Sequence, residues 1–454
     1  MLAALSSELG LHHLRAAHSP RDVALLLASR FVRLIGFGGF APVLILFLRS
    51  IDLPDQHVGL FLSATLAGDV LLSLFVTWTA DALGRRKMLA LGSLLMGASG
   101  IVFYLSSNYL ALLLAAVIGI ISPSGNEAGP FAALEQAALS QLTEPEGRVS
   151  LLMWYQVLGF FGISVGNILT GWIVQAAEGA GQSTSEAYRQ VFLGYAVVSA
   201  IKVVLSLAMT RNVEIDHPPF NVPPSSHPVG DSERQPLLQN SRAPESATST
   251  ASAILDPPAL PPVPPSLPLG RLIALCAIFA LDSFASSLIP LSFFSYHFRE
   301  NFHAPVLLIT RVFAATSLIG CVSQLAAGSI SKRLGIILTM VATHMPAQLF
   351  TIGVGLSPTL PLALTFFIGR ACIATMDSSV RAAFLAAVVP KESRTRFLGI
   401  VNICKTLAST PGPTLSLGLA ALGGMRWSFV IAGGIKLLYD AALFVGFKAA
   451  KLEH

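Results

Sequence analysis

The residues of this sequence that are most informative about chemistry are charged side chains placed inside long apolar runs. A charge at the centre of a membrane-spanning helix costs about 2.5–3.5 kcal/mol on an insertion scale, so such residues pair with one another or have a function such as binding a solute or carrying protons. The cations of this kind are Arg30, Arg33, Lys202, Arg271, Arg311, Arg370, Arg381, Lys405 and Lys436. The carboxylates are Asp69, Glu127, Glu135, Asp282, Asp377 and Asp440.

The composition explains why these charges stand out. Hydrophobic residues make up 53% of the 454 residues and charged residues only 12%, with a mean hydropathy of +0.69. A soluble domain has about 25% charged residues, so we predict a polytopic protein embedded in a lipid bilayer. The net charge of +5 comes mostly from Lys and Arg near the ends of the apolar runs, and no nucleic-acid partner is expected. The four cysteines lie inside apolar runs at no metal-ligand spacing, so we expect no disulfide, metal site or cofactor.

Twelve apolar runs have about the 20 residues that a helix needs to cross a bilayer. Six precede residues 212–268 and six follow them, and they begin near residues 23, 57, 88, 109, 150, 188, 269, 306, 336, 359, 395 and 426. The predicted fold is therefore an all-α membrane protein of twelve transmembrane helices. Its predicted parts are an N-terminal tail (1–22), two six-helix bundles (23–211 and 269–448) and a C-terminal tail (449–454).

Residues 212–268 differ in composition from the rest of the chain. They are rich in Pro and Ser and poor in aromatic residues, which predicts a disordered linker. Lys and Arg crowd the flanks on the linker side, fourteen against four on the other side, and the positive-inside rule then predicts a cytoplasmic linker and cytoplasmic termini. Within the linker, Glu233, Leu237 and Leu238 match an acidic dileucine sorting signal, which favours a vacuolar membrane over the plasma membrane.

The two halves are similar to each other in sequence. Arg148 and Arg394, each near the end of a fourth or tenth span, lie 246 residues apart, and Lys202 in span six matches Lys436 in span twelve. Repeated bundles of this kind bind substrate near the middle of the membrane, between the repeats. We therefore predict two pseudo-symmetric six-helix bundles with a central site.

Equivalent positions of the two halves carry charges of opposite sign. Arg33 in span one corresponds to Asp282 in span seven, and Glu135 in span four corresponds to Arg381 in span ten. Our hypothesis is that these four charges form pairs across or beside the central cavity, and that the pairs change as the cavity opens.

Span ten contains an arginine with no obvious local partner. Asp377 and Arg381 are four residues apart and are expected to pair along one helix face. Arg370 lies on the same face without a nearby carboxylate. Its planar fork suits a carboxylate or phosphate of a substrate. The alternative is a salt bridge that holds the halves together.

Three further features suggest parts of a solute pathway. Asp69 and Glu127 are candidates for exchanging protons, because a carboxylate in a low-dielectric cavity can do so near neutral pH. Glu127 lies beside Asn126 in a Pro- and Gly-rich break of span four, and irregular backbone at membrane depth occurs only against protein or a water-filled cavity, so this break is the predicted first-half wall of the site. The alternative for both carboxylates is a fixed pair with a nearby cation. Lys405, close to the prolines at 411 and 413 in span eleven, marks a charge and a kink in a moving gate.

The loop between the second and third runs has a recognisable pattern. Asp81-Ala82-Leu83-Gly84-Arg85-Arg86 resembles the loop between helices two and three of the major facilitator superfamily, although Thr77 and Ala82 depart from the family pattern. The resemblance implies that Asp81 and Arg85 tie the cytoplasmic end of span two to the other half in the outward-facing state, with Gly84 allowing the turn. Alternatively, Arg85 and Arg86 bind lipid phosphates only.

The combined prediction is a monomeric secondary active transporter that moves a small organic solute by alternating access. An anionic solute and coupling to protons are favoured. The main alternative is a receptor or scaffold without transport activity, because a fold does not determine a function. The sequence shows no Ser/His or paired-Asp motif at catalytic spacing and no phosphate-binding glycine loop, so an enzyme is not expected.

Overall fold

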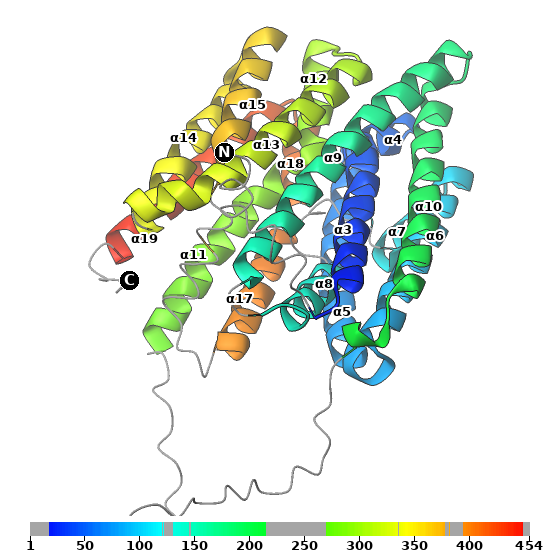
Figure 1. Ribbon diagram of the computed structural model, residues 1–454. Coiled ribbons are helices and arrows are strands. Elements are labelled where there is room, and N and C mark those ends of the chain that lie inside the picture. Colours follow the sequence, from blue (N-terminus) through cyan, green and yellow to red (C-terminus); the bar gives the residue numbers. More distant parts are fainter. Residues whose placement is uncertain are drawn as a thin grey trace, which may run out of the picture. The chain divides into compact units, whose positions relative to one another are not determined.

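The computed structural model describes residues 18–119, 121, 130–144, 147–214, 269–334, 336–376, 381 and 394–447. Some helix residues, Asp81 and Arg271 among them, are described for their backbone alone. All regular elements in these ranges are helices (Figure 1). The predicted linker and tails lie mostly outside the described residues, as do the linker residues Glu233, Leu237 and Leu238.

A described helix begins within a few residues of each predicted span start. The first half contains α3 (Pro20–Phe40), α4 (Leu44–Ser50), α5 (Asp55–Leu83), α6 (Arg85–Leu105), α7 (Tyr109–Gly119), α8 (Pro130–Gln141), α9 (Arg148–Gly179), α10 (Thr184–Ala208) and the short 3-10 helix η1 (Arg211–Val213). The second half contains α11 (Leu269–Leu288), α12 (Leu291–Phe302), α13 (Val306–Leu334), α14 (Ile336–Leu356), α15 (Leu360–Ala374), α17 (Arg394–Ser409), α18 (Gly412–Ala421) and α19 (Met425–Phe447).

Eight helical segments of the described chain are long and apolar enough to cross a membrane, and α7 and α15 are shorter apolar helices. Many large apolar side chains on their outer faces are exposed, as expected for surfaces that contact lipid. These helices agree with the predicted all-α membrane fold.

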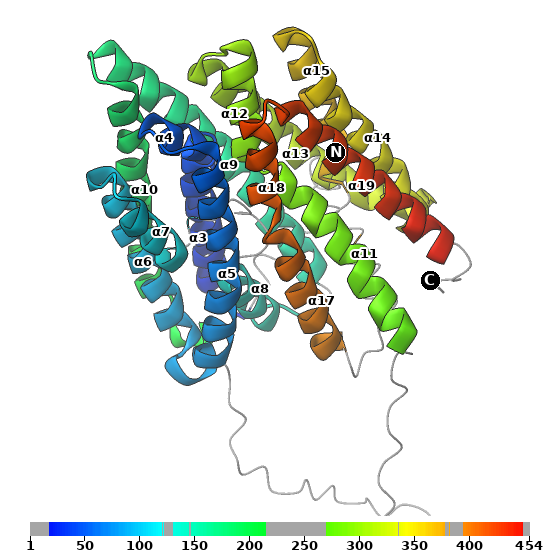
Figure 2. The same ribbon diagram turned by 180° about the vertical axis from the view of Figure 1, so that it is seen from behind.

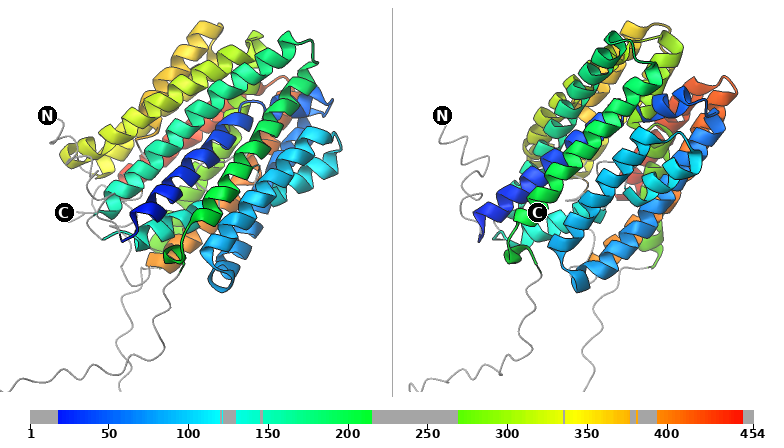
Figure 3. Two further views of the ribbon diagram at one scale, coloured as in Figure 1. Left: turned by 45° about the vertical axis from the view of Figure 1, so that its right-hand side comes forward. Right: turned by 90° about the vertical axis from the view of Figure 1, so that its right-hand side faces the viewer.

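The second span of each half packs against the fifth span of the other half. α9 packs along α13, and α5 packs against α18, which Figure 2 shows from behind. Inside the first half, α3 lies between α9 and α10, as seen in Figure 3. Inside the second half, α14 packs on α19 and α11 packs on α17. The halves therefore meet along two helix pairs, and the residues between these pairs are the place to look for a site.

Glycines bring α3 and α9 very close together. A Cβ atom added at Gly38 would lie 2.3 Å from the carbonyl oxygen of Ile163, and one added at Gly166 would lie 2.2 Å from the carbonyl oxygen of Ile35. Both obstacles are backbone atoms, which cannot move aside as a flexible side chain can. Small residues at a helix contact allow this close approach of two backbones within a membrane.

The loop between α5 and α6 is held by the end of the first half. Gly84 has a φ of 89°, a conformation that favours glycine. The Glu214 carboxylate accepts hydrogen bonds from the backbone N–H groups of Arg85 (2.6 Å) and Arg86 (3.3 Å). At the start of α6 these two groups have no carbonyl partner within the helix itself. The Arg85 side chain donates to Gln141 (2.8 Å), also in the first half. In this arrangement Arg85 is bound within its own half. The predicted tie to the other half concerns the outward-facing state and stays a prediction, and the Asp81 side chain lies outside the description.

The contact between α3 and α9 gives the first testable prediction. Gly166→Ala should destabilise the protein by about 1–3 kcal/mol, the usual cost of adding volume to a closely packed interior. The measurement is the unfolding temperature of the purified protein in detergent. The matched control is Gly434→Ala in α19, where nothing lies within 4 Å of the added Cβ. Alanine favours a helix over glycine, so this control should leave the unfolding temperature unchanged or raise it.

Candidate functional site

A cavity of about 430 Å³ lies between the two halves. Its volume is in the range of small-molecule sites. The described residues of the first half that line it are all apolar, namely Phe37, Leu66, Phe160 and Ile163. All the polar and charged side chains of the described wall come from the second half. The cavity therefore has one apolar face and one polar face.

The polar face has more cations than carboxylates. Arg370, Arg381 and Lys405 line it, together with one described carboxylate, Asp282, which is bound to Arg381. The Arg370 guanidinium lies 5.3 Å from the ring centre of Phe294, and its Nε donates to the Thr351 hydroxyl (3.2 Å). Neither Arg370 nor Lys405 forms an ion pair with a carboxylate in the described part of the chain. Two cations of the wall are thus positioned to bind an anion.

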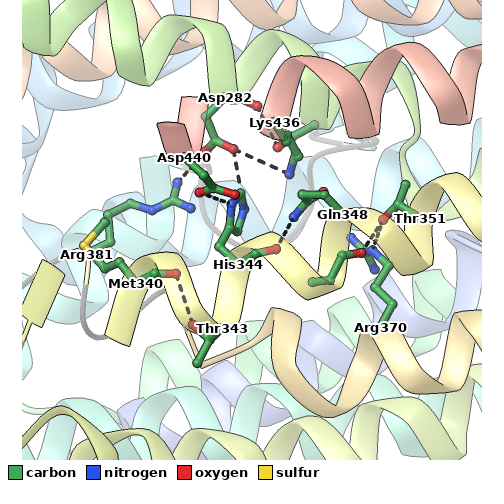
Figure 4. A network of polar contacts seen from close by, with 12 residues as sticks. Asp282, Met340, Thr343, His344, Gln348, Thr351, Arg370, Arg381, Lys436 and Asp440 are labelled. Atoms are coloured by element: carbon green, nitrogen blue, oxygen red, sulfur yellow. Dashed lines mark hydrogen bonds and ion pairs between the residues drawn. The ribbon is translucent and has the colours of Figure 1, made fainter. Parts of the chain in front are cut away.

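Asp282 is the centre of a buried charge cluster in the second half, which Figure 4 shows. Its carboxylate lies 2.6 Å from the Arg381 guanidinium and 3.5 Å from the Lys436 ammonium. His344 Nε2 lies 3.9 Å from Asp282 Oδ1, and His344 Nδ1 lies 2.8 Å from Asp440 Oδ1. The cluster joins Asp282 on α11, His344 on α14, Lys436 and Asp440 on α19, and Arg381, so it fixes these parts of the chain to one another.

Glu135 is the centre of an equivalent cluster in the first half. It accepts hydrogen bonds from Arg33 (2.8 Å) and the Tyr155 hydroxyl (2.7 Å), and the Lys202 ammonium lies 3.5 Å away. The Arg30 guanidinium stacks 4.4 Å above the ring centre of Tyr155. The Glu135 side chain is fully buried, and neither Glu135 nor Arg33 lines the described wall of the cavity.

The predicted inversion of charge between the halves is thus present in three dimensions. Of the two alternatives, pairs across the cavity or pairs beside it, the Asp282–Arg381 pair follows the second, and no described ion pair crosses between the halves. Arg33 pairs with Glu135, and Asp282 pairs with Arg381, so each pair lies inside one half. In both halves a residue of the first helix pairs with a residue of the fourth. The lysine of the sixth helix contacts whichever of the two is the carboxylate. A buried charge needs a close partner, and the nearest partner lies within the same bundle.

The remaining predicted site residues have different outcomes. Asp69 is buried on α5 and is not part of the described wall of the cavity. Asn126, Glu127 and Asp377 lie outside the described residues, so the predicted pair of Asp377 with Arg381 stays a prediction. Arg370, Lys405, Asp282 and Arg381 are brought together in one cavity wall, as far as the described residues show.

Two groups of site residues were missed by the sequence reasoning. One is the apolar wall of Phe37, Leu66, Phe160 and Ile163, which nothing in the sequence separates from other apolar residues of the spans. The other is His344, which lies inside the apolar run of span nine. Its position inside an apolar run together with Asp440 and Lys436 was the available signal, but their proximity depends on how α14 packs on α19.

A bundle of apolar helices around a polar cavity is typical of membrane transporters, and comparison with known proteins gives the same class. Residues 26–379 match the model of the Major Facilitator Superfamily. The chain belongs to this family, which identifies it as a multi-pass membrane transporter. It is 30% identical, over 94% of its length and 95% of the relative's, to an uncharacterized membrane protein of Saccharomyces cerevisiae.

Solved structures of transporters share the fold. A bacterial homolog of the human lysosomal transporter Spinster, in an inward-facing and occupied conformation, superposes with a TM-score of 0.66 at 14% identity, covering 94% of this chain and 96% of that one. The human organic anion transporter MFSD10 superposes with a TM-score of 0.56 at 16% identity, covering 93% and 99%. At these identities the likeness shows the fold alone.

The Glu135 cluster gives the second prediction. Glu135→Gln leaves Arg33 and Lys202 buried without their carboxylate and should destabilise the protein by about 3–5 kcal/mol. The readout is again the unfolding temperature. Glu178→Gln, at the exposed end of α9, is the matched control and should have no effect. If the cluster acts as described, adding Arg33→Gln to Glu135→Gln should recover part of the loss, and purely additive effects would contradict it.

Proposed function

We propose that this protein is a secondary active transporter that moves a small organic anion by alternating access and couples this movement to protons. The observation that carries the proposal is the divided cavity, with Arg370 and Lys405 on a polar face and aromatic rings opposite. A hydrophilic inorganic anion would gain no binding energy from the apolar face. An uncharged apolar solute would gain none from two cations that form no ion pair with a described carboxylate. An organic anion uses both.

Arg370 is the residue best suited to hold the anionic group. Its guanidinium is oriented by the Thr351 hydroxyl and by the ring of Phe294, so it is held in place before a ligand arrives. A planar guanidinium binds carboxylate, sulfonate or phosphate oxygens in pairs, which an ammonium does not. Lys405 supplies a second positive charge in the same wall.

Contacts at the end of the bundle far from the linker support alternating access. There the Tyr296 hydroxyl on α12 donates to Asp55 at the start of α5 (2.7 Å), and Arg49 contacts the same carboxylate (3.2 Å). The Ser63 and Thr414 hydroxyls, on α5 and α18, are hydrogen bonded at 2.7 Å. These few bonds join the halves at one end and must break for the cavity to open there. In the proposed orientation, with the linker and both termini in the cytoplasm, these bonds close the outer end and the cavity is inward-facing.

The human organic anion transporter MFSD10 shares the fold, but the substrate class proposed here depends on this chain's own cavity. Asp69 and Glu127 remain the carboxylates proposed from the sequence to exchange protons. The membrane proposed is the plasma membrane or a vacuolar membrane. A receptor on the same fold is the alternative, and transport itself separates the two.

The third prediction tests the anion site. In a thermal-shift screen of benzenesulfonate, hippurate and phthalate, at least one anion should stabilise the wild-type protein, and Arg370→Gln should weaken its binding at least tenfold, the value of one or two charge-assisted hydrogen bonds. Arg370→Lys should be intermediate because it keeps the charge and loses the fork. Arg426→Gln, an exposed arginine, is the matched control and should bind normally.

Counterflow of the best-binding radiolabelled anion into proteoliposomes then tests transport. Wild type and Arg426→Gln should exchange it, and Arg370→Gln should not. Binding without exchange would favour the receptor. If none of the three anions stabilised the wild type, the proposed substrate class would be wrong.

A further inference from the structure

His344 on α14 lies between two buried carboxylates that come from two other helices. Its side chain is only 5% exposed, and those of Asp282 on α11 and Asp440 on α19 are 3% and 2% exposed. Nδ1 lies 2.8 Å from Asp440 Oδ1, while Nε2 lies 3.9 Å from Asp282 Oδ1 (Figure 4). Nδ1 is thus within hydrogen-bond distance of a carboxylate, and Nε2 faces a second carboxylate that lies slightly beyond hydrogen-bond distance.

The two nitrogens differ in what they can donate. A neutral imidazole has a single N–H, and an ionised carboxylate only accepts, so the short contact to Asp440 requires that proton on Nδ1. Nε2 then carries a lone pair that faces Asp282. A second proton on Nε2 would turn this contact into a charge-assisted hydrogen bond, provided that the two atoms approach by about 1 Å. The position is therefore suited to accepting one proton.

Asp282 connects this position to the cavity. Its carboxylate lines the wall and is the partner of Arg381, another wall residue, whereas His344 is not among the wall residues described. A carboxylate drawn toward a protonated His344 shares less of its charge with Arg381. Arg381 is then a better partner for an anion in the cavity. An anion held by Arg381 in turn leaves Asp282 free to stabilise the protonated imidazole.

We infer that His344, held by Asp440, is the group that takes up the coupled proton, and that Asp282 and Arg381 link this proton to the binding of an anion. The inference rests on the proposed function, and it moves the proton exchange from Asp69 and Glu127, the carboxylates proposed from the sequence, to His344. Coupling is reciprocal, so a proton that favours the anion is itself favoured by the anion. One proton and one anion would then move together.

The charges around His344 are consistent with this role. From α19 the imidazole is faced by Asp440, by the Tyr439 ring (5.5 Å between ring centres) and, through Asp282, by Lys436. Arg370 on α15 contacts α14 at Thr351, two helical turns away. The first-half cluster differs, because its described side chains include no histidine and its one carboxylate, Glu135, is bound by two cations.

The fourth prediction first tests whether His344 titrates. Infrared difference spectra of the reconstituted protein with isotope-labelled histidine, recorded between pH 8 and pH 5, should show an imidazole signal that is lost in His344→Gln. The matched control is His297→Gln. His297 is equally buried, on α12, but its described partners are Asn301 and aromatic rings rather than a carboxylate. This control should keep the His344 signal.

The second measurement tests the coupling with benzenesulfonate, which stays ionised throughout this pH range. Its dissociation constant for wild type and His297→Gln should fall by up to tenfold per pH unit on acidification, the limit for one linked proton. In His344→Gln it should change less than twofold. Asp440→Asn, which keeps the imidazole, should move the midpoint of the pH dependence to lower pH, and it replaces His344→Gln if that variant does not fold.

The outcomes separate this inference from the proposed function. A titration that His344→Gln leaves unaltered, or a pH-dependent affinity that survives this substitution, would overturn the inference while leaving the transporter intact. If benzenesulfonate bound the wild type at no pH while the His344 signal still titrated, the proton site would stand. The substrate class proposed above would then be wrong.

Discussion

The cost of burying a charge in a membrane protein is the constraint on which this structure depends. Asp282 and Glu135 are almost completely buried, and each is surrounded by cations and hydrogen-bond donors from several helices. Removing one partner of such a cluster leaves a charge that the interior cannot solvate. The clusters therefore specify which faces of the helices turn inward, in a setting where lipid removes most of the hydrophobic driving force between helices.

The two clusters have the same architecture with opposite signs. In one half the first helix supplies the cation and the fourth the carboxylate, and in the other half the roles are exchanged. This exchange has a functional consequence. Asp282 and Arg381 of the second half line the cavity, whereas the equivalent Arg33 and Glu135 are not among the described residues of its wall. A symmetric scaffold thus carries a strongly asymmetric site.

The contacts between the halves differ in a way that suits motion. Within the first half, glycines bring the α3 and α9 backbones so close together that no side chain fits between them at these positions. Between the halves, at the end far from the linker, the side-chain bonds of the described residues are few and involve neutral hydroxyls or a single carboxylate, Asp55. Rigid bundles joined by weak, reversible contacts are what rocking about a central site requires.

Much of the architecture was predictable from sequence because it follows from local quantities. Apolar runs of membrane length located the helices, and the spacing of charges between the halves revealed both the repeat and the inversion of sign at Arg33 and Asp282. These signals can be read from the sequence because each concerns a segment of about 20 residues, or a constant offset between two segments. The helix starts of the structure confirm the predicted starts of the spans.

The partners of the charges were decided only by the tertiary structure. The sequence determined that Asp282 and Arg381 needed oppositely charged neighbours, but not that each would find them inside its own half, or that His344 would lie between Asp282 and Asp440. The apolar face formed by Phe37 and Phe160 was equally hidden, since a cavity exists only where helices fail to touch. Pairing and cavity shape depend on the rotation and crossing of helices far apart in the chain, and no local pattern encodes these.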